Sequence, residues 1–398
     1  MKLTLIFASL FLLQHNLYAI DPKTNLELRE LEFQKRENVL NRKINRSSYL
    51  PKISLESGFE FNKEHPNFEN ESGPLLYLQL KQNIFSGGKN YYESKVINLE
   101  NERIKLLTQI KERDIKLDSI KLLAEIKTLE NKLGIIKTEA SENLKLKAMV
   151  LRKIAAGLSS NSETIEFETN EIAISDKALI VEHDLLKLKE ELLKKYSYQY
   201  SFEELKKDLE FNNIELSNDH KAPIEEKLNQ LNLKRNELIV SKVKTDYYPT
   251  IDLEAKAGHI TAANNYEFSN TKEYQVAINF SLPLFSGGET YYELQKEKNN
   301  NRLEKNRTDV EAMSIKNNLD LDLKKLNLVK AQIKNSQNIF AKNVKHFEMI
   351  QSEFKRGIKE GSDLLRALSE LTEAKMKLIE LESELTTNEA KIKLYYQY

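Results

Sequence analysis

The sequence predicts an α+β chain in which one unit of about 190 residues occurs twice. First, Ile84–Glu93 (IFSGGKNYYE) returns 200 positions later as Leu284–Glu293 (LFSGGETYYE). Second, each unit contains two short segments in which apolar and polar residues alternate, as they do in β-strands. Third, long proline-free segments carry apolar residues at alternating spacings of four and three, the pattern of coiled coils. Each unit is therefore predicted to be helix, β-hairpin, long helix, turn and long helix.

The composition of the 398 residues excludes several classes of protein. Charged residues make up 31% of the chain, which excludes a bundle of membrane helices, because each such helix needs about 20 apolar residues in a row. Lys+Arg and Asp+Glu are equal at 61 each, so the chain lacks the excess positive charge of nucleic-acid-binding proteins. Cysteine is absent, which excludes a small disulfide-stapled scaffold and an acylated N-terminal cysteine.

Residues 1–19 have the pattern of a signal peptide. Lys2 supplies a positive charge, Leu3 to Leu13 form an apolar run, and Leu17-Tyr18-Ala19 offers a cleavage site. A buried N-terminal helix is the alternative, but the run is short and the chain turns polar directly after it. The sequence therefore predicts export.

The repeat sets the expected domain boundaries. Gly157 matches Gly357 at the same offset, and Tyr49-Leu50-Pro51 matches Tyr247-Tyr248-Pro249. Because a residue before proline is driven toward extended backbone, the first helix of each unit must end before Pro51 or Pro249. We expect a first repeat over residues 20–220, with a hairpin at about 50–86 and long helices at about 88–200, and a second over 221–398, with a hairpin at about 248–286 and long helices at about 288–396.

The alternating segments predict hairpins with one apolar and one polar face. In the first strand Ile53, Leu55 and Phe59 alternate with Ser54 and Glu56. A soluble sheet would lay its apolar face on a core. Four strands are too few to close a barrel, which needs about eight. Three chains with four strands each would close a twelve-stranded barrel whose apolar residues face lipid and whose polar residues face a wet lumen.

Aromatic residues lie at both ends of the predicted strands, as in the aromatic belts of membrane barrels. The ordinary strand propensity of Tyr and Phe is the alternative explanation. The residues at the helix-proximal ends are Tyr49, Phe85, Tyr247, Tyr248 and Phe285, and those near the loop ends are Phe61, Tyr266 and Phe268.

The long helices are predicted to pack as coiled coils. Between Gly88 and Ala156 there is no proline, and about 65 helical residues span roughly 100 Å. The apolar positions with coiled-coil spacing are Leu122, Ile126, Leu129, Leu133 and Ile136 in the first copy, and Leu319, Leu323, Leu326 and Ile333 in the second.

Three features together resemble the TolC-like outer-membrane efflux protein family. They are the Tyr-x-Pro motif before each hairpin, the phrase from Pro283 to Gly288, and the segment Arg356-Gly357 followed by Ser362-Asp363-Leu364-Leu365. The resemblance covers nearly the whole chain after residue 19. It depends on the order of the motifs, which is the same in both copies of the repeat. The first copy departs from it, because Asn83-Ile84-Phe85 stands where the family has Pro-Leu-Phe. The chain is also short for the family, which implies a small equatorial domain near residues 200–222.

The resemblance implies a homotrimer with a short β-barrel in the outer membrane of a Gram-negative-type bacterium and a long helical barrel crossing the periplasm. Its implied partners are outer-membrane lipid, a periplasmic adaptor (membrane fusion) protein and, through it, an inner-membrane transporter, with no nucleic acid and no cofactor. The implied function is the exit duct of a tripartite efflux or type I secretion system. Drugs, metals and proteins all remain open as the cargo.

An exported periplasmic coiled-coil structural or adaptor protein is the main alternative, and a plain porin needs many more strands per chain. An enzyme is not expected. Gly87-Gly88-Lys89 lacks the rest of a phosphate-binding loop, and the six histidines include no metal-binding pair.

The resemblance also assigns site residues. The two turns between long helices should contact the adaptor, with Ala156, Gly157 and Leu158 in one and Arg356, Gly357 and Ile358 in the other. A glycine helix cap explains the two glycines as well. The periplasmic gate should contain Glu163, Lys359, Asp363 and Arg366, where an acidic ring would select cations and ion pairs would hold the end shut. Solvated surface charge is the alternative for these four.

The Gly-Gly pairs are predicted to mark the junction between barrel and helical tunnel. Glycine tolerates the change of backbone direction where a strand ends and a helix begins. The adjacent phenylalanines are expected at the membrane interface. The junction residues are Pro51, Phe85, Gly87, Gly88, Pro249, Pro283, Phe285, Gly287 and Gly288.

Overall fold

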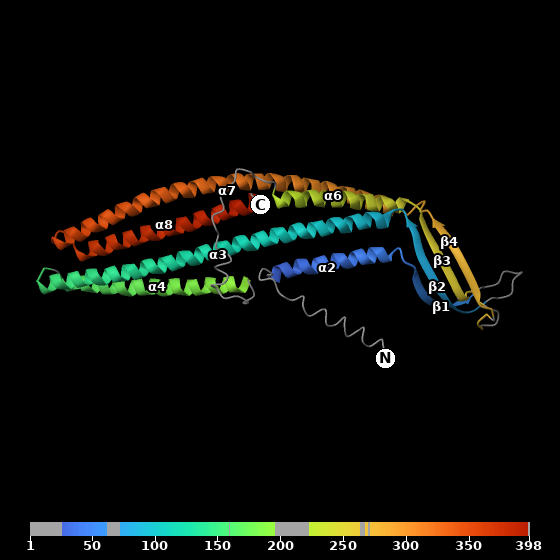
Figure 1. The fold of residues 1–398 in the computed structure, drawn as a ribbon, viewed down its shortest axis with the longest axis horizontal. Coiled ribbons are helices and arrows are strands. Elements are labelled where there is room, and N and C mark those ends of the chain that lie inside the picture. The colour runs from blue at the N-terminus through green and yellow to red at the C-terminus, as the bar shows by residue number, and fades with distance from the viewer. Residues whose placement is uncertain are drawn as a thin grey trace, which may run out of the picture. The chain divides into compact units, whose positions relative to one another are not determined.

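A computed structural model describes residues 26–61, 72–158, 160–195, 223–262, 267–269 and 271–396. The predicted signal peptide, the equatorial segment near 200–222, Tyr266 and the side chain of Phe61 lie outside the described residues. Helices and strands follow the predicted order in both copies (Figure 1). They are α2 (Leu26–Ser47), β1 (Lys52–Phe61), β2 (Ser72–Ser86), α3 (Lys89–Ala155) and α4 (Asn161–Lys195), then α6 (Ile224–Lys244), η1 (Thr245–Tyr247), β3 (Thr250–His259), β4 (Glu273–Ser281), α7 (Glu289–Lys355) and α8 (Gly361–Tyr396).

The four strands form one antiparallel sheet in the order β1-β2-β3-β4. The two hairpins are joined by pairing of β2 with β3, so the repeats share a single sheet. Leu78 lies opposite Leu55 on one side and Ala257 on the other. The register shifts between Asn83 and Phe85, which is a β-bulge. As a result Phe85, rather than Ile84, lies opposite Ile251.

The second hairpin ends earlier than expected. β2 continues to Ser86, two residues before Gly88, whereas β4 ends at Ser281 rather than near residue 286. Pro283 has no backbone N–H to donate to a ladder, so pairing stops before it. The first copy has Asn83 in the corresponding place and its strand continues. The departure of the first copy from the Pro-Leu-Phe phrase therefore has a structural effect.

Helices α3 and α7 are each 67 residues long, which corresponds to about 100 Å at 1.5 Å per residue. The helices before the hairpins stop where the prolines require: α2 ends at Ser47, and α6 ends at Lys244. Tyr248, which precedes Pro249, has extended backbone angles. Within the described residues, no helix has the length and apolar content to cross a membrane.

The chain divides into two compact units, and each unit takes segments from both repeats. The sheet unit comprises Glu30–Gln109 and Ile224–Met313, and therefore holds all four strands. The helical unit comprises Met1–Arg29, Ile110–Pro223 and Ser314–Tyr398, and holds the ends of α3 and α7 together with α4 and α8.

The core of the helical unit is a series of small clusters along the helices. Leu122, Ile126 and Leu192 join α3 to α4, as the coiled-coil spacing predicts. Other clusters join α3 to α8 and α7 to α8. Near the two turns all four helices meet around the fully buried rings of Phe167 and Phe354. We call this end of the helical unit the tip.

In the sheet unit, α2 and α6 pack along the first part of α3. The Asn38 side chain of α2 donates to the carbonyl of Ile97 in α3 at 3.0 Å. From α6, Lys242 pairs with Glu93 of α3. These contacts attach the short helix of each repeat to the helix that follows β2.

Candidate functional site

The two turns at the tip have the same backbone. Gly157 and Gly357 have φ of 72° and 81°. Gly157 donates to the carbonyl of Ile154 at 2.9 Å, and Leu158 donates to that of Lys153 at 2.9 Å. Gly357 and Ile358 repeat this pair of bonds one repeat later. This is the Schellman helix end, which favours glycine because a side chain is strained at positive φ.

The surroundings of the turns leave room for a partner. A Cβ on Gly157 or Gly357 would meet nothing within 4 Å. The positive φ therefore accounts for both glycines without invoking crowding inside the chain. Leu158 and Ile358, next along, are 75% and 64% exposed. Ala156 and Arg356 are exposed beside them. All six predicted docking residues thus lie on the two turns, with an apolar side chain open on each.

Three of the four predicted gate residues are joined by ion pairs. Arg366 donates to Asp363 at 2.7 Å, and the ammonium of Lys359 lies 3.6 Å from the same carboxylate. The backbone N–H of Glu360 also points to Asp363 at 3.5 Å. Asp363 is the third residue of α8, and a carboxylate there caps the helix start. The same carboxylate thus caps α8 and holds two cations.

Within the described residues Glu163 forms no ion pair with Lys359 or Arg366, but it lies against the start of α8. A Cβ on Gly361 would come within 2.8 Å of Glu163 Oε2 and 3.1 Å of the Phe167 ring. That oxygen is buried and has no hydrogen-bond partner within the described chain. The first and second copies therefore meet where α4 and α8 begin. Sequence analysis missed Gly361, although a glycine as the first residue of a helix was a visible signal.

A second link across the tip was also missed. The ammonium of Lys153, near the end of α3, donates to the carbonyl of Phe354 in α7 and lies 3.8 Å from the centre of that ring. On the other side, the buried amide of Asn143 donates to the carbonyl of Phe167 in α4 at 3.2 Å. These polar contacts fix the helix ends relative to one another. Nothing in the spacing of single lysines or asparagines distinguishes them from surface residues.

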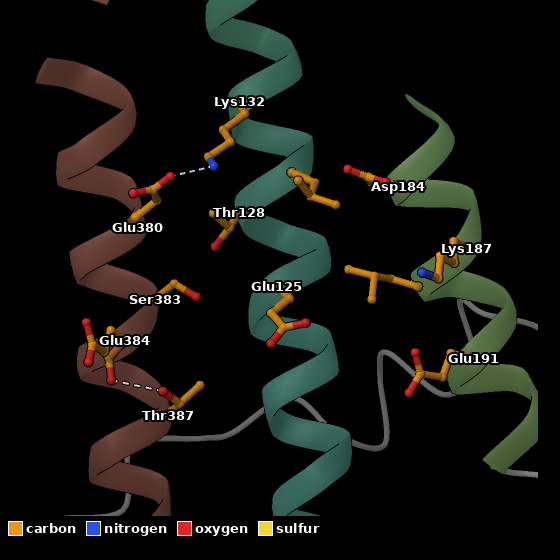
Figure 2. Close-up of a pocket in the computed structure, with 12 residues that line it drawn as sticks. Glu125, Thr128, Lys132, Asp184, Lys187, Glu191, Glu380, Ser383, Glu384 and Thr387 are labelled. Carbon is orange, nitrogen blue, oxygen red and sulfur yellow. Dashed lines mark hydrogen bonds and ion pairs between the residues drawn. The ribbon is translucent and has the colours of Figure 1, made fainter. Parts of the chain in front are cut away.

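Above the tip, α3, α4 and α8 border a cavity of ≈ 580 Å³ (Figure 2). The ammonium of Lys132 pairs across it with Glu380 at 2.6 Å. Burial raises the pKa of Glu380, but the hydrogen bond and charge of Lys132, with Lys377, outweigh it and lower the pKa below its usual value. The side chains around the cavity carry both signs of charge and belong to interhelical packing.

A buried carboxylate lies on α3 closer to the tip. Glu139 is 3% exposed, and its Oε2 has no hydrogen-bond partner among the described residues. Burial raises the pKa of this carboxyl; Lys177 of α4 opposes the rise and Glu373 of α8 adds to it. Glu139 therefore destabilises the packed helices when it ionises.

Gly87 and Gly88 lie directly between β2 and α3, whereas Gly287 and Gly288 lie at the end of a longer connection from β4 to α7. Gly87 and Gly287 both have φ of 65°, and Gly88 and Gly288 have φ of 90° and 88°. Their surroundings differ between the copies. A Cβ on Gly87 would lie 2.6 Å from the carbonyl oxygen of Thr245, whereas one on Gly287 would meet nothing within 4 Å.

The other junction residues flank these glycines. Pro51 and Pro249 come directly before β1 and β3, and Lys89 at the start of α3 pairs with Asp246 at 2.9 Å. Pro283 and Phe285 lie in the connection from β4 to α7, where Phe285 is 87% exposed. The five aromatic residues predicted at the helix-proximal end of the sheet are all exposed: Tyr49, Phe85, Tyr247, Tyr248 and Phe285.

The two faces of the sheet differ sharply. One face carries large apolar side chains that no other described residue covers: Ile53, Leu55, Tyr274, Val276, Ile278 and Phe280 are 65–82% exposed. On the other face Glu254 accepts hydrogen bonds from Gln79 at 2.5 Å and Asn279 at 3.0 Å, with Lys256 at 3.1 Å. Asn83 donates to Asp252 at 2.9 Å. The predicted alternation is confirmed. Among the residues that the structure describes, no core covers the apolar face, which contradicts the soluble-core interpretation.

One amphipathic four-stranded sheet built from two hairpins, each followed by a pair of long helices, is the architecture that the resemblance to outer-membrane channels implies. Residues 230–395 match the model of the outer membrane efflux protein family. This match confirms the predicted resemblance and the outer-membrane localisation that accompanies it. No curated protein matches the sequence.

Solved structures show the same fold over nearly the whole chain. The outer membrane protein VceC of Vibrio cholerae has a TM-score of 0.75 at 12% identity, covering 93% of each chain. The CmeC outer membrane channel of Campylobacter jejuni has a TM-score of 0.74 at 13% identity, covering 94% of this chain and 84% of that one. The MtrE outer membrane channel of Neisseria gonorrhoeae, in its open state, has a TM-score of 0.71 at 12% identity, covering 94% and 86%. The predicted fold class is confirmed.

Proposed function

We propose that three copies of this chain form the outer-membrane exit duct of a tripartite efflux system. The observation that carries the proposal is the sheet, which has an uncovered apolar face, a hydrogen-bonded polar face and two unpaired edge strands, β1 and β4. Twelve strands from three copies close a barrel with the apolar residues in lipid and the polar ones in the lumen. In this arrangement β1 of one copy pairs with β4 of the next.

The helical unit continues the duct into the periplasm and meets the adaptor at the tip. Leu158 and Ile358 offer one exposed apolar side chain on each turn, six in the trimer, to a helical hairpin of the adaptor. The Asp363 carboxylate, with Lys359 and Arg366, places charge at the same end and supports its assignment as the gate. The duct moves substrate without chemical change. Type I secretion of proteins is a variant of this proposed function, in which the same duct serves a different inner-membrane transporter.

Membrane fractionation tests this function against a soluble coiled-coil protein. We expect the chain in the outer membrane, as an oligomer that survives detergent and falls to monomer on boiling. Purified oligomers should form channels in a planar bilayer. A monomer in the soluble periplasmic fraction would overturn the proposal and support the structural or adaptor alternative.

A further inference from the structure

Another cavity lies within the sheet unit, where α3, α6 and α7 approach one another. Its volume is ≈ 310 Å³, near the lower end of the roughly 300–1,000 Å³ of small-molecule sites. Such sites are usually apolar, so a wholly polar lining favours a charged ligand. We call it the α6 cavity. The six side chains that line it are Glu100 and Arg103 of α3, Asn232, Arg235 and Asn236 of α6, and Glu304 of α7.

Half of the lining groups make no hydrogen bond within the described chain. These are the amides of Asn232 and Asn236 and the carboxylate of Glu304. Both asparagines are half-buried, and the Glu304 side chain is only 20% exposed. Its one ion pair is with Arg307 at 3.7 Å, a side chain that is 64% exposed. Half-buried polar groups without protein partners bind either water or a ligand.

The two arginines of the α6 cavity converge on one carboxylate. Arg103 donates to Oε1 of Glu100 at 2.8 Å, and Nε of Arg235 lies 3.5 Å from Oε2. This Nε is buried and makes no hydrogen bond to any described residue. Because Glu100 carries one negative charge, it neutralises only one of the two guanidinium groups. One positive charge therefore remains on the side of α3 and α6, and Glu304 places a negative charge on the side of α7.

This separation of charge selects the class of ligand. A simple anion would be attracted by the arginines and repelled by Glu304, and a simple cation would meet the reverse. A molecule with both charges satisfies both sides at once. Its carboxylate accepts hydrogen bonds from a guanidinium group, and its ammonium donates to Glu304. The amides of Asn232 and Asn236 can donate to the first group and accept from the second.

The second copy of the repeat has no such pair of charges on its long helix. At the offset of 200, Glu100 and Arg103 correspond to Asn300 and Leu303. Asn300 donates to Glu297 of its own helix at 3.2 Å, and Leu303 is 47% exposed. The charged lining of the α6 cavity is therefore not a packing feature that the duplicated architecture requires.

We infer that the α6 cavity binds a small zwitterion with an α-ammonium and an α-carboxylate group, as in a free amino acid. Arg235, supported by Arg103, holds the carboxylate, and Glu304 holds the ammonium. All six lining residues belong to the sheet unit of a single copy. The binding site therefore goes beyond the proposed duct and does not depend on it.

Calorimetric titration of the purified full chain in a non-ionic detergent tests the inference. Glycine is the probe, because it carries only the two charged groups and has no side chain that could clash. Acetate and methylammonium, each with one of the two charges, are the matched probes. We expect saturable heat with glycine and binding about 10–100-fold weaker with either single-charge probe, because each loses the charged hydrogen bonds on one side.

Variants connect this binding to the α6 cavity. Arg235→Gln and Glu304→Gln should each weaken glycine binding by about 10–100-fold, because each removes the charge on one side. Arg235→Lys keeps the charge and should lose less. Arg302→Gln is the matched control: it removes an exposed arginine of α7 that does not line the cavity, and it should bind glycine like the unaltered chain. Helical circular dichroism checks that every variant is folded.

Three results would overturn the inference. Acetate binding as tight as glycine binding would make the α6 cavity an anion site instead. Equal glycine binding in the unaltered chain, Arg235→Gln and Glu304→Gln would place the ligand elsewhere. Absence of saturable heat with all three probes would show that the cavity holds water only. None of these results bears on membrane location or channel formation, which fractionation and bilayer recording test separately.

Discussion

The ammonium of Lys153 donates to the backbone carbonyl of Phe354 and lies 3.8 Å from the centre of the Phe354 ring. One side chain thus ties the end of α3 to the end of α7, next to both turns of the tip. The ring beneath it is fully buried, so the contact is shielded from water on one side. Cation–π contacts and charged hydrogen bonds in such places contribute about 1–3 kcal/mol each.

Lys153→Met keeps most of the length of the side chain but removes its charge. We expect the free energy of unfolding to fall by about 2 kcal/mol, seen as a lower melting temperature of the helical circular dichroism signal. Lys355→Met, an exposed lysine one residue after Phe354, is the matched control and should change little. Equal melting of the two variants would show that the link adds nothing.

The tip glycines allow docking to be separated from folding. Because Gly157 and Gly357 have positive φ in open space, asparagine should be tolerated there and valine should not. Gly157→Asn/Gly357→Asn should therefore assemble normally while placing a polar side chain beside each exposed apolar residue. We expect weaker capture of the adaptor and reduced export. Undiminished capture and export would refute the assignment of the turns as the docking surface.

The two Gly-Gly junctions form a natural matched pair. Alanine at either Gly87 or Gly287 is strained by about 1–2 kcal/mol, because both have φ of 65°. Only Gly87→Ala also meets the Thr245 carbonyl oxygen at 2.6 Å, which adds about 1–3 kcal/mol of overpacking. Trimer yield should therefore fall more for Gly87→Ala than for Gly287→Ala. The reverse order would contradict the described packing. At the second glycine of each pair, valine should impair assembly in both copies.

The gate assignment is tested by conductance. Asp363→Ala removes the partner of Arg366 and Lys359, and Arg366→Ala removes the closer cation. We expect a higher single-channel conductance in both variants and weaker cation preference in Asp363→Ala, because fewer ion pairs hold the end and the acidic ring is lost. Asp363→Asn keeps the shape and the helix cap, and so separates charge from capping. Unchanged conductance and selectivity in both alanine variants would leave these residues as surface charges.

Glu139, which is buried, and Glu380, which is partly exposed, should respond to pH in opposite directions. The raised pKa of Glu139 means that its stabilising contribution is complete below the ordinary value of 4.5 and is lost as pH rises. Glu139→Gln should therefore have a higher melting temperature than the unaltered chain near neutral pH, and this gain should vanish in acid.

The pKa of Glu380 is lowered, so its stabilising contribution is present above 4.5 and is lost in acid. Glu380→Gln should therefore have a lower melting temperature near neutral pH. Thermal melts across this range check both signs.

Sequence patterns predicted the fold well because each pattern has a direct physical cause. The period-two alternation around Leu55 and Leu78 fixes which face of the sheet is apolar, whatever surrounds it. The prolines at 51 and 249 end helices by local geometry. The bulge at Ile84 and the early end of β4 were missed, because they depend on pairing between strands far apart in sequence.

The site was predictable only where it depends on the local backbone. Gly157, Gly357 and the Gly-Gly pairs stand out because the chain has 11 glycines in all. The links from Lys153 to Phe354 and from Glu163 to Gly361 join residues about 200 positions apart, and no local spacing reveals them. The seven-residue spacing of Ile165, Ile172, Leu179 and Leu186 is visible in the sequence, but only their exposure shows that these side chains point away from the described chain.

The open edges of the sheet have a consequence for how the protein reaches its membrane. A single copy can complete the β2–β3 pairing alone, yet β1 and β4 keep unsatisfied backbone groups beside an uncovered apolar face. Such edges join to any available strand, so an unassembled copy is prone to aggregate. If three copies pair β1 with β4 as proposed, assembly removes both open edges at once, and the copy that has not yet assembled is the aggregation-prone form of the protein.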